Sequence, residues 1–234
     1  MSELLQSFLD NDSFFGRIMT RIGMIIGANL MFVLFSMPIL TGGAAFTALY
    51  HVMFKLLRGD GVLNPFREFW GGFRSNFKQS TLYWCVLLML VAFGYMDLRF
   101  CAQMGGILTL FQYGIYGLGL IALIVTLYLF PVIAAFENTL LNQIKSAFYF
   151  AVHNIRNLII ILFCSIFPMV MTYMDLQYQP LYAFCWCTFG FAALAMLGAK
   201  LLLPDFKPYL DPISDAPEEK SEKEILEEMK KLGM

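Results

Sequence analysis

The sequence predicts an all-α, polytopic membrane protein, because apolar segments of membrane-spanning length follow one another along the chain. Hydrophobic residues make up 59% of the 234 residues, and the mean hydropathy is +0.67. Charged residues make up 14%, against about a quarter in a typical soluble domain. Four long stretches lack Lys, Arg, Asp and Glu altogether: 22–54, 100–136, 158–174 and 176–199. Since about 20 apolar residues cross the hydrocarbon core as a helix, we expect five transmembrane helices, with a sixth left open.

The membrane domain is expected over residues 22–203. An amphipathic lead-in over 1–21 precedes it, and a charged cytoplasmic tail over 204–234 follows it. The expected spans are, in chain order, 22–40, 81–96, 107–134, 158–174 and 181–203. In the first span, Gly23 and Gly27 have the GxxxG spacing that lets another helix approach closely.

The segment 44–57 has two interpretations. Its pattern is helical, but at 1.5 Å per residue it extends only about 21 Å, which is less than the roughly 30 Å of the bilayer core. It is therefore either an interfacial helix or a sixth span. The stretch 66–78 mixes aromatic and basic residues at helical spacing, which is typical of an amphipathic helix in the cytoplasmic headgroup layer.

The basic residues predict the orientation, since cytoplasmic loops are enriched in Lys and Arg. Three segments are then cytoplasmic: 41–80, 135–157 and the tail. This arrangement leaves only Arg17, Arg21 and Arg99 of the sixteen basic residues outside. If 44–57 crosses the membrane, the N-terminus moves inside and only Arg99 remains outside. In both cases we expect a multi-pass protein of the cell membrane with a cytoplasmic C-terminus.

A faint internal repeat favours five spans. Pro38 to Phe46 resembles Pro131 to Phe136, and Asn76-Phe77-Lys78 resembles Asn154-Ile155-Arg156. Each half then contains a span, a proline exit, an Ala-Ala-Phe sequence, an amphipathic helix and a new span. In this scheme 44–57 corresponds to a stretch after the second proline that is hard to place in lipid.

Glu137 and Asn138 are the best functional candidates, at the expected cytoplasmic mouth of the 107–134 span. The carboxylate could pair with Arg58 or Lys78 across the repeat, or bind a basic residue of a partner. The plainer interpretation is an interfacial ion pair.

Other candidate residues come from the repeat and from the first proline exit. Asn76 joins Lys78 as a contact residue. Pro38, Thr41 and Gly42 could form a broken-helix site whose free backbone groups bind a polar solute. The plainer interpretation of these three residues is a tight turn leaving the membrane.

The chain resembles the YesL family of bacterial membrane proteins over about residues 10–205. The motifs that carry the resemblance are Asn29, Ser36 to Ala45, Ala48-Leu49, Lys55 to Gly59, Phe69, Phe73, Asn76 to Ser80, Trp84 and Phe136 to Leu140. The resemblance implies a domain of unknown function, typical of Gram-positive bacteria. It also implies a role around sugar uptake, because the family's genes often lie near those for carbohydrate importers and glycoside-degrading enzymes.

Catalytic and cofactor motifs are absent from the sequence, which has no HExxH, GxSxG or Walker loop. The two histidines, His51 and His153, have no evident third and fourth metal ligand. We therefore expect no enzyme activity, no metal and no cofactor. We also expect no nucleic-acid partner, because no segment forms a strongly basic surface. Cys101 is the one cysteine outside the expected spans, and we expect it to be the thiol that reacts readily.

Two functions follow from these observations. The first is an accessory or regulatory component associated with carbohydrate uptake, with the lipid bilayer and a sugar importer complex as partners and the oligomeric state left open. The alternative is a small transporter or channel for a neutral polar solute, supported by proline breaks at matching places in the two halves. Ion coupling has no evident carrier, since no ionisable residue lies deep in a span.

Overall fold

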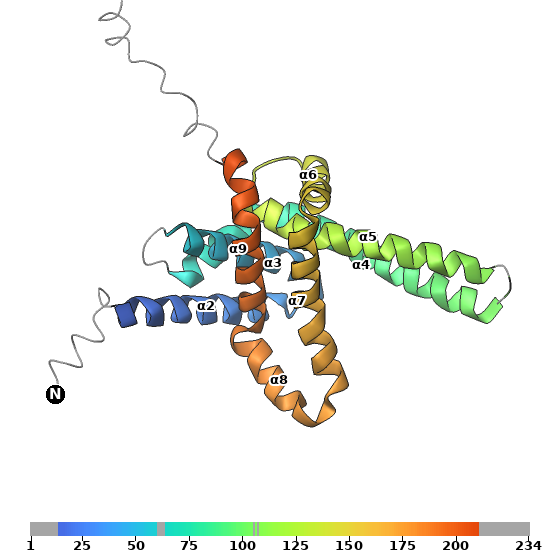
Figure 1. The fold of residues 1–234 in the computed structure, drawn as a ribbon, viewed down its shortest axis with the longest axis horizontal. Helices are drawn as coiled ribbons and strands as arrows, with labels where there is room; N and C mark the ends of the chain where they lie inside the picture. The colour runs from blue at the N-terminus through green and yellow to red at the C-terminus, as the bar shows by residue number, and fades with distance from the viewer. Residues whose placement is uncertain (1–13, 60–63, 105, 107, 211–234) are drawn as a thin grey trace, which may run out of the picture.

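A computed structural model describes residues 14–59, 64–104, 106 and 108–210 of the chain (Figure 1). Within these residues all regular structure is helical. Six helical segments are long and apolar enough to cross a membrane. The predicted all-α polytopic fold is therefore confirmed, with six such segments where five were favoured.

Helix α2 (Phe14–Ser36) combines the expected lead-in and the first span. The helix is not interrupted at the boundary expected at residue 21, because no proline lies between 14 and 36. The helix ends two residues before Pro38, whose ring disfavours a helical conformation in the residue before it. A short 3₁₀ turn, η1 (Ile39–Thr41), then reverses the chain.

Helix α3 (Gly42–Arg58) is the centre of the molecule. Twelve of its 17 residues are buried, and it packs against α2, α4, α5 and α9. A helix lying on the bilayer surface would bury a single face. The structure therefore favours the sixth-span interpretation of 44–57 over the interfacial one, and 39–58 is one of the six segments of spanning length and composition.

Helix α4 (Pro65–Met104) runs for 40 residues without a break. The expected amphipathic stretch 66–78 and the expected span 81–96 both lie within this one helix, because no helix-ending residue separates them. Pro65 occupies the first helical position, where its missing N–H costs nothing. The Asn64 side chain caps this end by accepting hydrogen bonds from the backbone N–H groups of Phe66 and Arg67.

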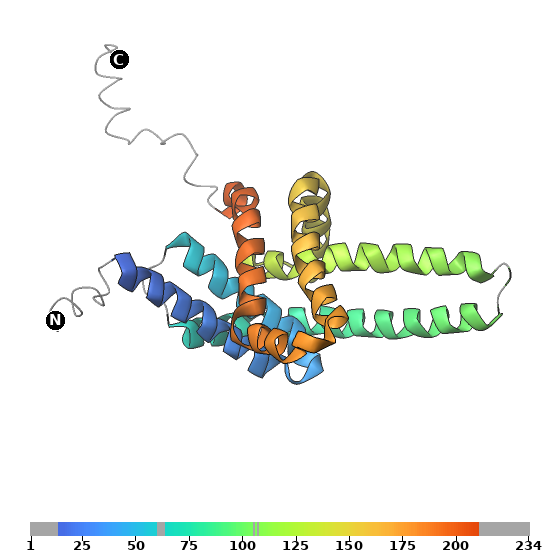
Figure 2. The same ribbon diagram turned by 60° about the horizontal axis from the view of Figure 1, so that its bottom comes forward.

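Helices α4 and α5 (Leu108–Ala135) form a hairpin that projects from the core as an arm. Figures 1 and 2 both show the arm along the long axis, with α7 and α9 running in another direction. Only 6% of the most apolar part of α4 is buried, against 67% for the α3 segment. Apolar surface exposed to this extent suits contact with lipid chains. Cys101 is only 7% exposed, so its expected ready reactivity is not supported.

The second half of the chain differs from the first. Its elements are α6 (Leu140–His153), α7 (Ile155–Met174), η2 (Leu176–Tyr178), α8 (Gln179–Cys185), the π-helical η3 (Trp186–Gly190) and α9 (Phe191–Leu210). Helix α5 continues past Pro131 to Ala135, and within the described residues no counterpart of α3 follows it. The internal repeat that favoured five spans is therefore incomplete in the structure.

Helix α9 extends seven residues beyond the expected end of the membrane domain at 203. It continues through Pro204 and Pro208, where the packing of Phe206 holds the helix against its neighbours. Phe206 is fully buried, with ring centroids 4.8 Å from Phe150 and 5.2 Å from Phe136. Residues 211–234, which hold the rest of the predicted tail, lie outside the described part of the chain.

Candidate functional site

The pairing of α3 with α4 builds the floor of the candidate site. The two helices run antiparallel, and every fourth residue of α3 contacts α4, as neighbouring turns of one helix face must. The contacts are Gly43 with Ser80 and Trp84, Thr47 with Ser80, His51 with Gly72, and Lys55 with Glu68. These contacts fix the register of the pair and place the C-terminal half of α3 beside the first turns of α4.

Two glycines allow this close approach. A Cβ atom on Gly43 would lie 2.7 Å from the carbonyl oxygen of Ser80 and 2.6 Å from the Trp84 Cβ. A Cβ atom on Gly72 would lie 3.0 Å from the His51 ring. The His51 side chain therefore rests on the bare backbone of α4, half-buried between the two helices.

The end of α5, the following loop and α6 form the opposite wall. The Gln79 side chain donates a hydrogen bond to the backbone carbonyl of Asn138 at 3.0 Å and so ties α4 to the loop. The Asn138 side chain accepts bonds from the Thr139 backbone and the Asn142 side chain. The loop is thus held by hydrogen bonds from α4, from α6 and within itself, and the Glu137 side chain extends from it.

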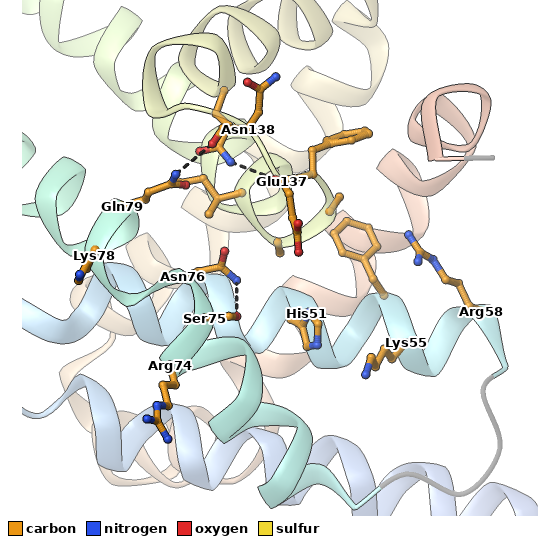
Figure 3. A pocket seen from close by; sticks show the side chains of 16 residues that line it. His51, Lys55, Arg58, Arg74, Ser75, Asn76, Lys78, Gln79, Glu137 and Asn138 are labelled. Atoms are coloured by element: carbon orange, nitrogen blue, oxygen red, sulfur yellow. Dashed lines mark hydrogen bonds between the residues drawn. The ribbon is translucent and has the colours of Figure 1, made fainter. Parts of the chain in front are cut away.

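A cavity of about 740 Å³ lies between these walls. Its polar and charged lining residues are His51, Lys55, Arg58, Arg74, Ser75, Asn76, Lys78, Gln79, Glu137, Asn138 and Gln143. In Figure 3 the Glu137 carboxylate points into the space between Asn76 and His51, whereas the Arg74 side chain points away from it. The volume is typical of a small-molecule site.

The charges lining the cavity are mostly positive, with four basic side chains and one carboxylate. Lys55 is neutralised by Glu68, with Nζ and Oε2 2.6 Å apart. This is the one ion pair among the residues that the structure covers. Glu137 lines the same cavity as Arg58 and Lys78, but the expected ion pair with either base does not form. The loop is held by hydrogen bonds of amide groups, and from it the Glu137 carboxylate points into the space between Asn76 and His51.

Gln143 contributes an incomplete hydrogen-bonding group. The residue is 2% exposed, and its Nε2 donates to the backbone carbonyl of Phe136 at 3.0 Å. Its Oε1 is buried and has no partner. Leaving a buried acceptor unpaired costs about 1–3 kcal/mol, so this oxygen is an unusual feature of the cavity wall.

The structure brings together five of the eight predicted site residues: Arg58, Asn76, Lys78, Glu137 and Asn138. The other three, Pro38, Thr41 and Gly42, lie at the opposite end of α3. There the Thr41 hydroxyl donates to the carbonyls of Phe35 and Pro38, and the Trp84 indole donates to the carbonyl of Ile39. The backbone groups that a solute would need are therefore bonded internally, as in the tight-turn interpretation.

Sequence reasoning missed His51 and Gln143 as members of the site. His51 belongs to the stripe Gly43, Thr47, His51 and Lys55, whose four-residue spacing marks one face of a helix. Gln143 lies in helical register with Ala147 and Phe150, which are both buried. In each case the signal was a polar side chain on an otherwise packed helix face.

Comparison with known families gives one match. Residues 25–98 match a family model described as "Protein of unknown function, DUF624". This segment contains α3 and the part of α4 that forms the floor of the cavity, and it ends before the α5–α6 loop. Among curated proteins and among solved structures no match was found.

Proposed function

We propose that this membrane protein acts through the cavity between α3, α4 and the α5–α6 loop, as an accessory or regulatory component associated with carbohydrate uptake. The observation that carries the proposal is that residues from distant parts of the chain meet there. Arg58 and Asn76 come from the first half, and Glu137 and Asn138 from the second. Polar and charged side chains from both halves of the chain therefore line one cavity, as a binding site requires.

The link to carbohydrate uptake rests on the sequence resemblance to the YesL family. The match of residues 25–98 supports a family of unknown function, and the more specific name is part of the proposal.

The cavity is proposed to face the cytoplasm of a bacterial cell. Basic residues cluster around it at the C-terminal end of α3 and the start of α4, and bases concentrate on the cytoplasmic side of membrane proteins. A site in this position is accessible to cytoplasmic ligands and to cytoplasmic domains of a transport complex.

Co-purification from native membranes in mild detergent tests the proposal. We expect a sugar-importer component to be enriched with the wild-type chain, and the enrichment to fall at least fivefold with Glu137→Gln or Asn138→Ala. The matched control is Asp97→Asn, since Asp97 is an exposed carboxylate near the far end of α4. The proposal fails if no importer component is enriched, or if all four proteins enrich it equally.

A transporter or channel for a neutral polar solute has less support. The backbone groups near Pro38 are bonded internally. A second cavity, of about 1040 Å³ between the arm and helices α7 and α9, is lined almost entirely by apolar side chains, with Asp97 as its one charged residue. Flux of a neutral sugar into liposomes that hold the pure protein would favour the transporter over the accessory role.

A further inference from the structure

We propose that the cavity binds a phosphate compound that carries free hydroxyl groups. This inference rests on the proposed function, because it assigns a ligand class to the same site. Two independent features of the cavity support it, namely unpaired positive charge and unpaired hydrogen-bond acceptors.

The positive charge is the first feature. Arg58 and Lys78 line the cavity and form no ion pair with any residue that the structure covers. Arg58 extends from the C-terminal end of α3 towards the same space as Glu137 (Figure 3). A guanidinium group binds phosphate oxygens through two parallel hydrogen bonds, so Arg58 is the expected anchor for the phosphate. Lys78 adds long-range attraction from the rim.

The acceptors are the second feature. Oε1 of Gln143 is buried without a donor, and the Glu137 carboxylate extends into the cavity without a cationic partner. Inorganic phosphate has only its own P–OH groups as donors, and they belong to the same charged group that the carboxylate repels. Hydroxyl groups donate hydrogen bonds to both. The Gln143 oxygen is covered in the structure, so a ligand hydroxyl reaches it only after the wall shifts.

The size of the cavity agrees with a ligand larger than phosphate itself. A volume of about 740 Å³ lies within the range of roughly 300–1,000 Å³ found for small-molecule sites. Two kinds of compound at a membrane carry a phosphate together with free hydroxyl groups. One is a soluble phosphorylated polyol, and the other is the headgroup of a lipid such as phosphatidylglycerol.

Binding to the full-length chain in nanodiscs of phosphatidylcholine tests the inference by calorimetry. We expect glycerol 3-phosphate to bind at least tenfold more tightly than either inorganic phosphate or glycerol. If the natural source is a lipid, nanodiscs that contain phosphatidylglycerol abolish this binding by occupying the site. If the source is soluble, they leave it unchanged.

Substitutions test which side chain binds the phosphate and which bind the hydroxyl groups. Arg58→Gln is expected to weaken glycerol 3-phosphate binding about tenfold or more, since hydrogen bonds to charged groups are the strong ones. Gln143→Leu and Glu137→Gln are each expected to reduce the preference for glycerol 3-phosphate over inorganic phosphate at least threefold. Glu137→Gln retains the size of the side chain and covers the case in which Gln143→Leu does not fold. Lys145→Gln, an exposed base on α6 that does not line the cavity, is expected to leave all affinities unchanged.

Three results overturn the inference: no binding of glycerol 3-phosphate at millimolar concentration, equal affinity for inorganic phosphate, or equal loss in Lys145→Gln and Arg58→Gln. These failures are distinct from failure of the proposed function, which is measured by importer co-purification. A chain that binds glycerol 3-phosphate but enriches no importer component retains the ligand assignment and loses the accessory role.

Discussion

Asn29 is a fully buried polar residue in the apolar helix α2. Its Nδ2 donates to the carbonyls of Trp186 and Cys187, and its Oδ1 accepts from the backbone N–H of Ala192. These three backbone groups belong to the π-helical turn and the start of α9, where the regular α-helical hydrogen-bond pattern is interrupted. One side chain therefore completes the hydrogen bonding of the break in the last span.

We predict that Asn29→Leu destabilises the protein by at least about 2 kcal/mol, because it leaves buried backbone groups unpaired. Unfolding in detergent, followed by tryptophan fluorescence during titration with sodium dodecyl sulfate, measures the change. The neighbouring residue Leu30 is 50% exposed, so Leu30→Ala is the control and is expected to change the stability by less than about 0.5 kcal/mol. Equal stability of the two variants would contradict this role of Asn29.

Some residues of the candidate site could be predicted from their polarity and their position at the end of an apolar stretch. Glu137 and Asn138 stood out as polar residues directly after a long apolar stretch, and they line the cavity. Their hydrogen-bond partners were not predictable, because Gln79 reaches Asn138 from 59 residues away. Pro38 and Thr41 were chosen for their free backbone groups, but the bonds that satisfy those groups include one from the distant Trp84.

At the scale of elements, the α3–α4 pair determines where the site lies. The pair depends on a glycine at its closest contact, since a Cβ on Gly43 would clash with both the backbone and a tryptophan of α4. Small residues at helix contacts are how helices associate in lipid, where the hydrophobic effect contributes little.

We predict that Gly43→Ala destabilises the pair by about 1–3 kcal/mol, because the added methyl group forces α3 away from α4. The change is measured as a lower thermal midpoint in detergent, together with loss of glycerol 3-phosphate affinity if the cavity floor shifts. Gly71→Ala is the matched control. Gly71 is also helical, but a Cβ there would meet nothing within 4 Å, so the variant is expected to be neutral or more stable by about 0.5–1 kcal/mol. A destabilised Gly71→Ala, or an unaffected Gly43→Ala, would refute the assignment.

Element boundaries were less predictable than element type. Charge-free stretches located the helices because lipid excludes charge. They did not locate the ends of α4 or α9, where aromatic packing and polar contacts continue a helix beyond its apolar part. Asp205 shows this directly, since it accepts a hydrogen bond from the buried Asn157 of α7 in a region that the sequence assigned to the charged cytoplasmic tail.

For the whole molecule, the position of α3 determines the topology. Six crossings place both termini on one side of the membrane, whereas five place them on opposite sides. The sequence left this choice open because α3 is short and carries His51 and Lys55. Contacts with other helices bury α3 and allow such a short helix to lie at the centre of a bundle. The length of the segment in the sequence does not reveal these contacts.

We predict that both termini are cytoplasmic. Leu5→Cys and Ile225→Cys, each made in a chain whose five native cysteines are replaced, are expected to react with a membrane-impermeant maleimide only after the cells are permeabilised. Gln103→Cys, at the exposed tip of the arm, is expected to react in intact cells and serves as the positive control. Reaction of Leu5→Cys in intact cells would instead support five crossings.

The unbroken course of α4 has a consequence for its length beyond the core. The helix has 40 residues, and its contacts with α3 extend from Glu68 to Trp84. Residues 85–104 therefore project beyond α3. At 1.5 Å per residue these 20 residues measure about 30 Å, which matches the thickness of the hydrocarbon core of a bilayer.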